Sequence, residues 1–191
     1  MAATVTLTMD EVATHTLNGL AVTKGGITFT FSDTGGGLSY NAASGGILTY
    51  VQDPSIAGTP EPFGVVFSVP VNFVQFGMVA SQTSPAAPIA TVNFYNGSTL
   101  VTTMTLNSSL TDPYAEGQLT YSSTPVTSMT VTPASFETIG FDNLTVTTAP
   151  PPTPVPSVPA TSPLTLALMT LGIVGFGGYA LRRRFGPSTS Y

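Results

Sequence analysis

Residues 89–106 read IATVNFYNGSTLVTTMTL, and this stretch predicts a β-hairpin. Asn96-Gly97-Ser98 supplies the turn, because Asn and Gly tolerate the positive φ that tight hairpin turns require. Residues 89–95 and 99–106 flank the turn as strands. On the second strand one face is expected to carry Leu100, Thr102, Met104 and Leu106.

The same alternation of apolar and polar residues extends outward over residues 1–148, and no apolar period of helical length occurs there. Further strands are predicted at 3–9, 26–32, 46–52, 63–69, 73–80, 117–122, 126–132 and 137–148. Turns rich in Gly, Pro, Asn and Asp separate about ten or eleven short strands. The pattern predicts an all-β fold, a two-layer antiparallel β-sandwich of jelly-roll or lectin-like type.

One segment breaks the alternation. Ile139 and Phe141 are odd-numbered, whereas the next apolar residues, Leu144 and Val146, are even-numbered. A bulge near Asp142–Asn143 would return all four side chains to one face. The alternative is that Asp142 simply accepts hydrogen bonds from local backbone amides.

Composition excludes several functions. Charged residues make up 7% of the chain, cysteine is absent, and residues 1–163 carry one lysine against nine acids, a formal charge of −8. Such a surface would not hold nucleic acid, and thiol chemistry is impossible. A Ser–His–acid triad would need His15, the single histidine, which is expected in a surface turn. Lys24 is the single lysine, expected in a turn beside two glycines. We therefore expect no enzyme, with a surface hydrolase as a remaining alternative.

Residues 149–191 predict a membrane attachment. Residues 149–163 contain seven prolines and form a linker, and residues 164–181 are uncharged and long enough for a transmembrane helix. A basic tail, 182–191, follows with Arg182, Arg183 and Arg184, which set a cytoplasmic end. Residues 1–148 would then face outward, yet residues 1–10 show no export signal, so we expect a signal peptide missing from this sequence.

This layout resembles the PEP-CTERM class of bacterial surface-sorting tails. The sorting-motif-like segment is Val155, Pro156, Ser157, Val158 and Pro159, in which Ser-Val stands where the class has Glu. Residues 140–146, GFDNLTV, resemble the closing strand of the β-sandwich in many such proteins. The resemblance implies export, processing by an exosortase-like enzyme, and a structural or adhesive role at the cell surface or in the extracellular matrix.

Two ligand classes remain open. Sandwich loops often hold calcium through oxygen ligands, and the candidates are Asp33, Asp53, Asp142 and Asn143, although solvated turn acids would look the same. No other cofactor is expected. Surface polysaccharide is the second class, stacked on exposed aromatic rings. The available tyrosines are Tyr40, Tyr50, Tyr95, Tyr114 and Tyr121, of which Tyr95 and Tyr114 are the candidate ligand residues, against the alternative of ordinary strand tyrosines.

Overall fold

The computed structural model describes residues 2–43, 48–81, 88–110, 114–134 and 137–150. The chain divides into two units, residues 1–151 and 152–191, and the described residues all belong to the first. They form eleven strands, which pair antiparallel, and no helix. The predicted all-β antiparallel fold is confirmed.

The strands, in chain order, have the following bounds. The first six are β1 (Thr4–Leu7), β2 (His15–Thr16), β3 (Ala21–Lys24), β4 (Ile27–Asp33), β5 (Leu38–Ala42) and β6 (Ser55–Gly58). The others are β7 (Phe63–Ala80), β8 (Pro88–Asn96), β9 (Thr99–Asn107), β10 (Ala115–Pro133) and β11 (Ile139–Thr148).

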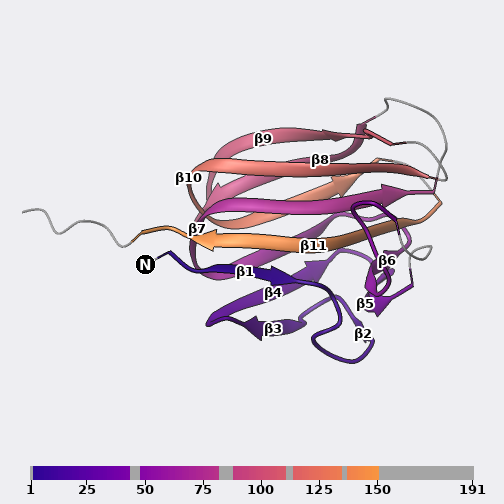
Figure 1. The fold of residues 1–191 in the computed structure, drawn as a ribbon, viewed down its shortest axis with the longest axis horizontal. Helices are drawn as coiled ribbons and strands as arrows, with labels where there is room; N and C mark the ends of the chain where they lie inside the picture. Colours follow the sequence, from indigo (N-terminus) through magenta and orange to yellow (C-terminus); the bar gives the residue numbers. More distant parts are fainter. Residues whose placement is uncertain (1, 44–47, 82–87, 111–113, 135–136, 151–191) are drawn as a thin grey trace, which may run out of the picture. The chain divides into compact units, whose positions relative to one another are not determined.

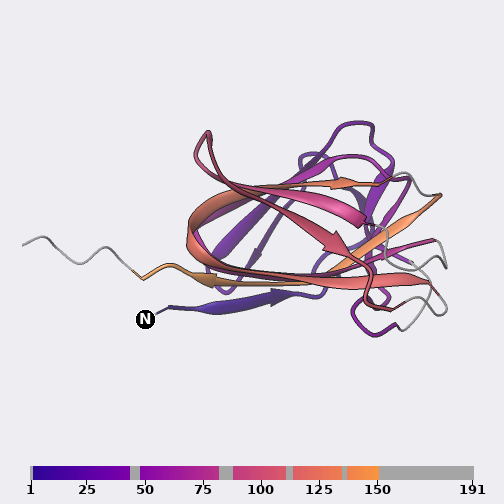
Figure 2. The ribbon, with the colours of Figure 1, turned by 90° about the horizontal axis from the view of Figure 1, so that it is seen from above.

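Two layers share the two longest strands, β7 and β10 (Figures 1 and 2). In the first layer the order is β3-β4-β7-β10-β8-β9, with the first part of β7 against β4. In the second layer the later part of β7 lies between β10 and β11, and β11 also pairs with β1 and β6. The small strands β5 and β2 continue from β6.

The sequence predicted four separate strands where the structure has two continuous ones, β7 and β10. Pro70 and Pro125 lie between the predicted strands, and proline cannot donate a ladder hydrogen bond. Instead, the β7–β10 register shifts between Ser122 and Val126, and again before Ser128. The chain thus passes from one layer to the other at an irregularity without ending the strand.

A second irregularity corrects the predicted face of β9. Phe94 pairs with Thr102, but the next residue, Tyr95, pairs with Leu100, so Val101 is an extra residue. Thr102, Met104 and Leu106 face the interior as predicted, with Met104 packed against the core and Leu106 in it. Leu100 lies on the other face and is 52% exposed. The bulge reversed its orientation.

The predicted bulge in β11 is confirmed. The register of β11 against β7 shifts between Asp142 and Thr145, and Asn143 has a φ of 55°. Asn tolerates this left-handed conformation better than most residues. Phe141 and Leu144 are consequently both buried on the core side.

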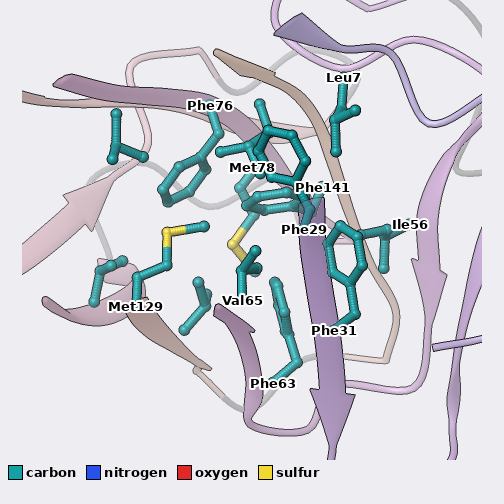
Figure 3. Packing of buried hydrophobic residues seen from close by; sticks show 14 of the residues in the cluster. Leu7, Phe29, Phe31, Ile56, Phe63, Val65, Phe76, Met78, Met129 and Phe141 are labelled. Atoms are coloured by element: carbon teal, nitrogen blue, oxygen red, sulfur yellow. The ribbon is translucent and has the colours of Figure 1, made fainter. Parts of the chain in front are cut away.

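Aromatic rings join the two layers in the core (Figure 3). Phe141 of β11 lies with its ring centroid 4.6 Å from that of Phe76 and 5.2 Å from that of Phe63. Phe63 belongs to the first part of β7 and Phe76 to the second, so Phe141 contacts side chains from both layers. Phe29 and Phe31 of β4 extend this cluster.

The strand predicted at 46–52 is wrong in its described part, where residues 49 and 50 form a bend and Gln52 alone is in an isolated β-bridge. Residues 48–52, here called the crossing segment, run across the outer face of the second layer. The carbonyl oxygen of Tyr50 lies so close to Gly77 of β7 that a Cβ at residue 77 would meet it at 2.1 Å.

Among the described residues no helix is long and apolar enough to cross a membrane, and the helix expected at 164–181 lies outside them.

Candidate ligand pocket

Small side chains hollow the outer face of the second layer. The register places Ser39 opposite Ala57, Ala57 opposite Gly140, and Gly140 opposite Val79. Residues directly opposite one another share a face, so these four form one row across β5, β6, β11 and β7. Because the first three have small or no side chains, a depression is left along the row.

This depression is part of a pocket with a volume of about 410 Å³. A pocket of this size lies within the range of natural ligand sites. Its lining combines the small residues of the row with hydroxyls and one aromatic ring. The lining residues are Gly37, Ser39, Ala42, Ala43, Ala57, Gly58, Val79, Ser81, Tyr114, Thr138 and Ile139.

The Ser81 hydroxyl of the pocket is held in place by the backbone. Ser81 donates its N–H to the carbonyl oxygen of Thr138 at 3.0 Å, and the Thr138 N–H donates to Ser81 Oγ at 2.9 Å. Since Ser81 Oγ already accepts this bond, its own O–H remains the group for a ligand oxygen. Tyr114 adds a ring that is 37% exposed.

The described lining residues include no Asp, Glu, Lys, Arg or His. A charged ligand would therefore enter this part of the pocket without a partner for its charge, which is costly. Hydroxyls beside an aromatic ring and apolar walls suit a ligand that is both neutral and rich in hydroxyls. The lining offers no pair of carboxylates for acid–base hydrolysis.

The row of the pocket continues from Val79 to Glu116 of β10, and Glu116 anchors the crossing segment. Glu116 is buried, and its carboxylate accepts the N–H groups of Thr49, at 3.1 Å, Tyr50 and Val51, at 2.8 Å. Three charge-assisted bonds to one carboxylate fix the backbone of this segment over the sheet.

Asp142 anchors the same segment from β11. Its Oδ2 accepts the Gln52 N–H and the Asn143 side-chain amide, both at 3.0 Å, and Asn143 also donates to the Tyr50 carbonyl oxygen at 3.1 Å. The other oxygen of Asp142 has no partner in the described part of the chain. Burial raises the pKa of Asp142 to about 6 although these hydrogen bonds oppose the shift. Asp142 thus accepts hydrogen bonds both from its neighbour Asn143, including the local backbone amide that the alternative assumed, and from Gln52, which is remote in sequence.

Glu11 organises a second polar cluster, between β1 and β3. Its carboxylate accepts Lys24 Nζ at 2.7 Å, the Thr8 N–H at 2.9 Å, and the hydroxyl of Tyr40. Burial by itself raises the pKa of Glu11. The bonds from Lys24, Tyr40 and Thr8 together outweigh burial and lower the pKa to about 2. Lys24, expected in a turn, therefore serves as an ion-pair partner at the end of β3.

This low pKa predicts a loss of stability in acid. The pKa of Glu11 is about 2 in the folded chain against 4.5 as the reference, so its contribution is complete above pH 4.5 and is lost as the pH falls toward 2. At neutral pH, Glu11→Gln should lower the free energy of unfolding by up to about 3 kcal/mol. Urea unfolding of both chains across this pH range should show the difference shrinking toward zero. A difference that stays constant would contradict the prediction, and Asp10→Asn is the control for removing one negative charge.

The four predicted calcium ligands are distributed over separate places. Asp142 and Asn143 lie together in the bulge of β11, Asp53 is exposed in the turn after the crossing segment, and Asp33 ends β4. Both carboxylate oxygens of Asp33 are buried, and its pKa is raised by burial first and then by the charge of Glu61. In the described residues no three His, Cys, Asp or Glu side chains are grouped as a metal site. Calcium stays a prediction, which melting temperatures with and without the ion would test.

The predicted tyrosine platforms divide by burial. Tyr40 and Tyr121 are buried, the first bonded to Glu11 and the second stacked on Phe94, so neither is a platform. The sequence could not show this, because Tyr40 lay outside the predicted strands and Tyr121 occupied an ordinary position in the strand predicted at 117–122. Tyr95 is half-buried on the outer face of the first layer, and Tyr114 lines the pocket.

Sequence reasoning missed most of the pocket. Ser39, Ser81 and Thr138 carry its hydroxyls, and none was a candidate. They are three among many Ser and Thr residues, and only the sheet register brings them together. Short segments of small residues, such as SIAG at 55–58, are the one signal that could have indicated a hollow face. His15, expected at the surface, is exposed in β2.

No family model and no curated protein matches the chain. Among solved structures, a family 29 carbohydrate-binding module is 12% identical, with a TM-score of 0.39, and covers 78% of this chain and 90% of its own. One from Piromyces equi is 10% identical, with a TM-score of 0.39 and coverages of 78% and 91%. A carbohydrate-binding module from Cellvibrio mixtus lichenase 5A, in complex with cellotriose, is 12% identical with a TM-score of 0.26 over 78% and 98%. TM-scores of this size mark a loose resemblance, and the case for function therefore comes from the pocket.

Proposed function

We propose that this chain is an exported cell-surface β-sandwich that binds a neutral polysaccharide in the pocket on the outer face of its second layer. One observation carries the proposal. The pocket of about 410 Å³ joins hydroxyl side chains, small residues and the exposed ring of Tyr114, and its described lining carries no charge. A sugar ring offers an apolar face for the tyrosine and hydroxyls for Ser and Thr, so it satisfies both kinds of surface.

Binding is favoured over hydrolysis because the described pocket lining supplies no titratable pair. The carboxylate of Glu116 and one oxygen of Asp142 accept backbone N–H groups of residues 49–52, so both buried acids have a structural role there. His15 lies in β2, which pairs with β5 at Tyr40 and Ser39, and its Nδ1 contacts the carbonyl oxygen of Thr16 at 2.6 Å. Among the described lining residues, the surface-hydrolase alternative therefore finds no Asp, Glu, Lys or His to act as a general acid or base.

The place of the domain at the cell surface is supported by the tail of the sequence. The proline-rich linker, the uncharged residues 164–181 and the cluster Arg182–Arg184 fit an export-dependent anchor, and Val155–Pro159 fits a sorting segment. We expect fractionation of the native host to find the chain at the surface or in the medium. Mass spectrometry of the C-terminus would separate a retained anchor from a cleaved one. A purely cytoplasmic protein would contradict export.

The pocket is tested with Tyr114→Ala, because Tyr114 is the aromatic ring in its described lining. We expect the variant to bind a neutral oligosaccharide about tenfold more weakly or worse, as one stacked ring contributes on the order of 1.4 kcal/mol. Isothermal titration with glucose-, xylose- and mannose-based oligosaccharides identifies the ligand and then compares the variants. Tyr95→Ala is the matched control, since it removes the same side chain from the other layer and should leave affinity unchanged. Equal losses in both variants would place the ligand elsewhere.

A further inference from the structure

Strand β9 lies at the edge of the first layer (Figure 1). It pairs with β8 on one side, and the described residues provide no strand on the other. Its nine residues, TLVTTMTLN, therefore present a row of backbone N–H and C=O groups along an open side. Such an edge is a template for another β-strand.

The other edge strands of the described fold are short or carry a charge at the edge. β1 has four residues and β2 has two, while β3 has four and ends with Lys24. Short length and edge lysines are two ways in which proteins prevent strands from adding to a sheet. β9 is longer than any of these and has no charged residue and no proline. The bulge at Val101 interrupts this edge, and residues 102–106, which pair regularly with β8, are its continuous uncharged part.

Apolar side chains remain uncovered beside this edge. Leu100 is 52% exposed because the bulge at Val101 turns it outward. Val101 and Met104 are half-buried and border a cavity of about 520 Å³ that also touches residues 120–124 of β10. A strand added along β9 would lie next to Leu100.

We infer that β9 pairs with β9 of a second copy of this chain, antiparallel and about a two-fold axis. This pairing needs no sequence other than β9 itself, since a two-fold axis places each residue opposite a residue of the same strand. The uncharged β9 brings no like charges together, although the unit as a whole is acidic. Threonine predominates in the strand, and threonine pairs stabilise opposed strands. The result is one sheet that continues through both copies.

The test compares two double variants of the unit formed by residues 1–151, whose strands and core partners all lie inside it. Thr103→Lys/Thr105→Lys places two lysines on the edge strand. Asn93→Lys/Thr91→Lys places two lysines at the residues directly opposite them on the interior strand β8. Both variants add the same charge to the same face, and both remove the hydrogen bond from Thr103 Oγ1 to Asn93 Oδ1.

Sedimentation equilibrium from micromolar to millimolar concentration should show a dimer for the wild-type unit. The dissociation constant should rise at least tenfold for the β9 variant and change much less for the β8 variant. A wild-type unit that stays monomeric, or a dimer equally affected by both variants, would overturn the inference.

Hydrogen exchange of the wild-type chain adds a measurement that needs no variant. The backbone amides of residues 100–105 should become more protected from hydrogen exchange as the protein concentration rises. Protection that does not change with protein concentration would contradict β9 pairing. Neither readout involves sugar, so a failure here is distinct from a failure of the pocket.

Discussion

Phe141→Ala should destabilise the sandwich by about 3–5 kcal/mol, a large share of the stability of an ordinary domain. Phe141 is fully buried, and its ring contacts Phe76 and Phe63, which belong to different layers. Removing the ring leaves a cavity where the layers meet. The two halves of β7 that line it are fixed by hydrogen bonding on both sides, so they cannot close over the space. Urea unfolding at neutral pH measures the loss.

Two companion variants sharpen this prediction. Phe141→Leu keeps an apolar side chain and should lose about 1–2 kcal/mol, because it fills part of the space. Thr147→Ala lies on the same strand, where the residue is half-buried and bonds only to the Thr4 hydroxyl at 2.9 Å, and should cost less than about 1 kcal/mol. If Phe141→Ala cost no more than Thr147→Ala, Phe141 would not join the layers as described.

Local patterns were enough for the fold class and for several strands. The alternation in 26–32 corresponds to β4, and the hairpin at Asn96-Gly97-Ser98 corresponds to the turn between β8 and β9. The parity switch before Leu144 correctly located the bulge in β11. In each case the signal and the structure concern the same few residues, since strand alternation and turn chemistry act over short distances.

Non-local features were beyond these patterns. The bulge at Val101 depends on how β9 is registered against β8, and no residue type at 100–102 indicates it. β7 continues past Pro70 because both neighbouring strands adapt there. Ser55–Gly58 became a strand because β5 and β11 flank it, since Ile56 is its one residue of high β-propensity.

In the candidate site, too, the sequence indicated a single residue type but not the non-local arrangement. Tyr114 was a candidate because tyrosine is a recognised sugar-binding residue, and it does line the pocket. The pocket itself arises from the row of Ser39, Ala57 and Gly140, which come from three strands distant in sequence. Glu116 was no candidate at all, because an isolated glutamate in a strand is usually at the surface. Its burial depends on a segment more than sixty residues earlier in the chain.

Glu116→Ala should destabilise the chain by about 3–5 kcal/mol and release the crossing segment. The substitution removes the acceptor of three N–H groups, from Thr49, Tyr50 and Val51. Each hydrogen bond to a charged group contributes about 1.5–3 kcal/mol, but part of the loss is recovered where the freed N–H groups reach water. Urea unfolding measures the global loss, and hydrogen exchange of residues 49–51 measures the local release.

The variant Glu116→Gln separates the effect of the carboxylate charge from that of the side-chain shape. Glu116→Gln retains one acceptor oxygen but turns an NH₂ group toward backbone donors, so it should lose roughly half as much as the alanine variant. Gln118→Ala is the control on the same strand: Gln118 is exposed, and its loss should stay within about 0.5 kcal/mol. Because the pocket row leads directly to Glu116 through Val79, release of the segment should also weaken oligosaccharide binding. A Glu116→Ala chain with unchanged stability and unchanged exchange at residues 49–51 would show that other contacts hold the segment.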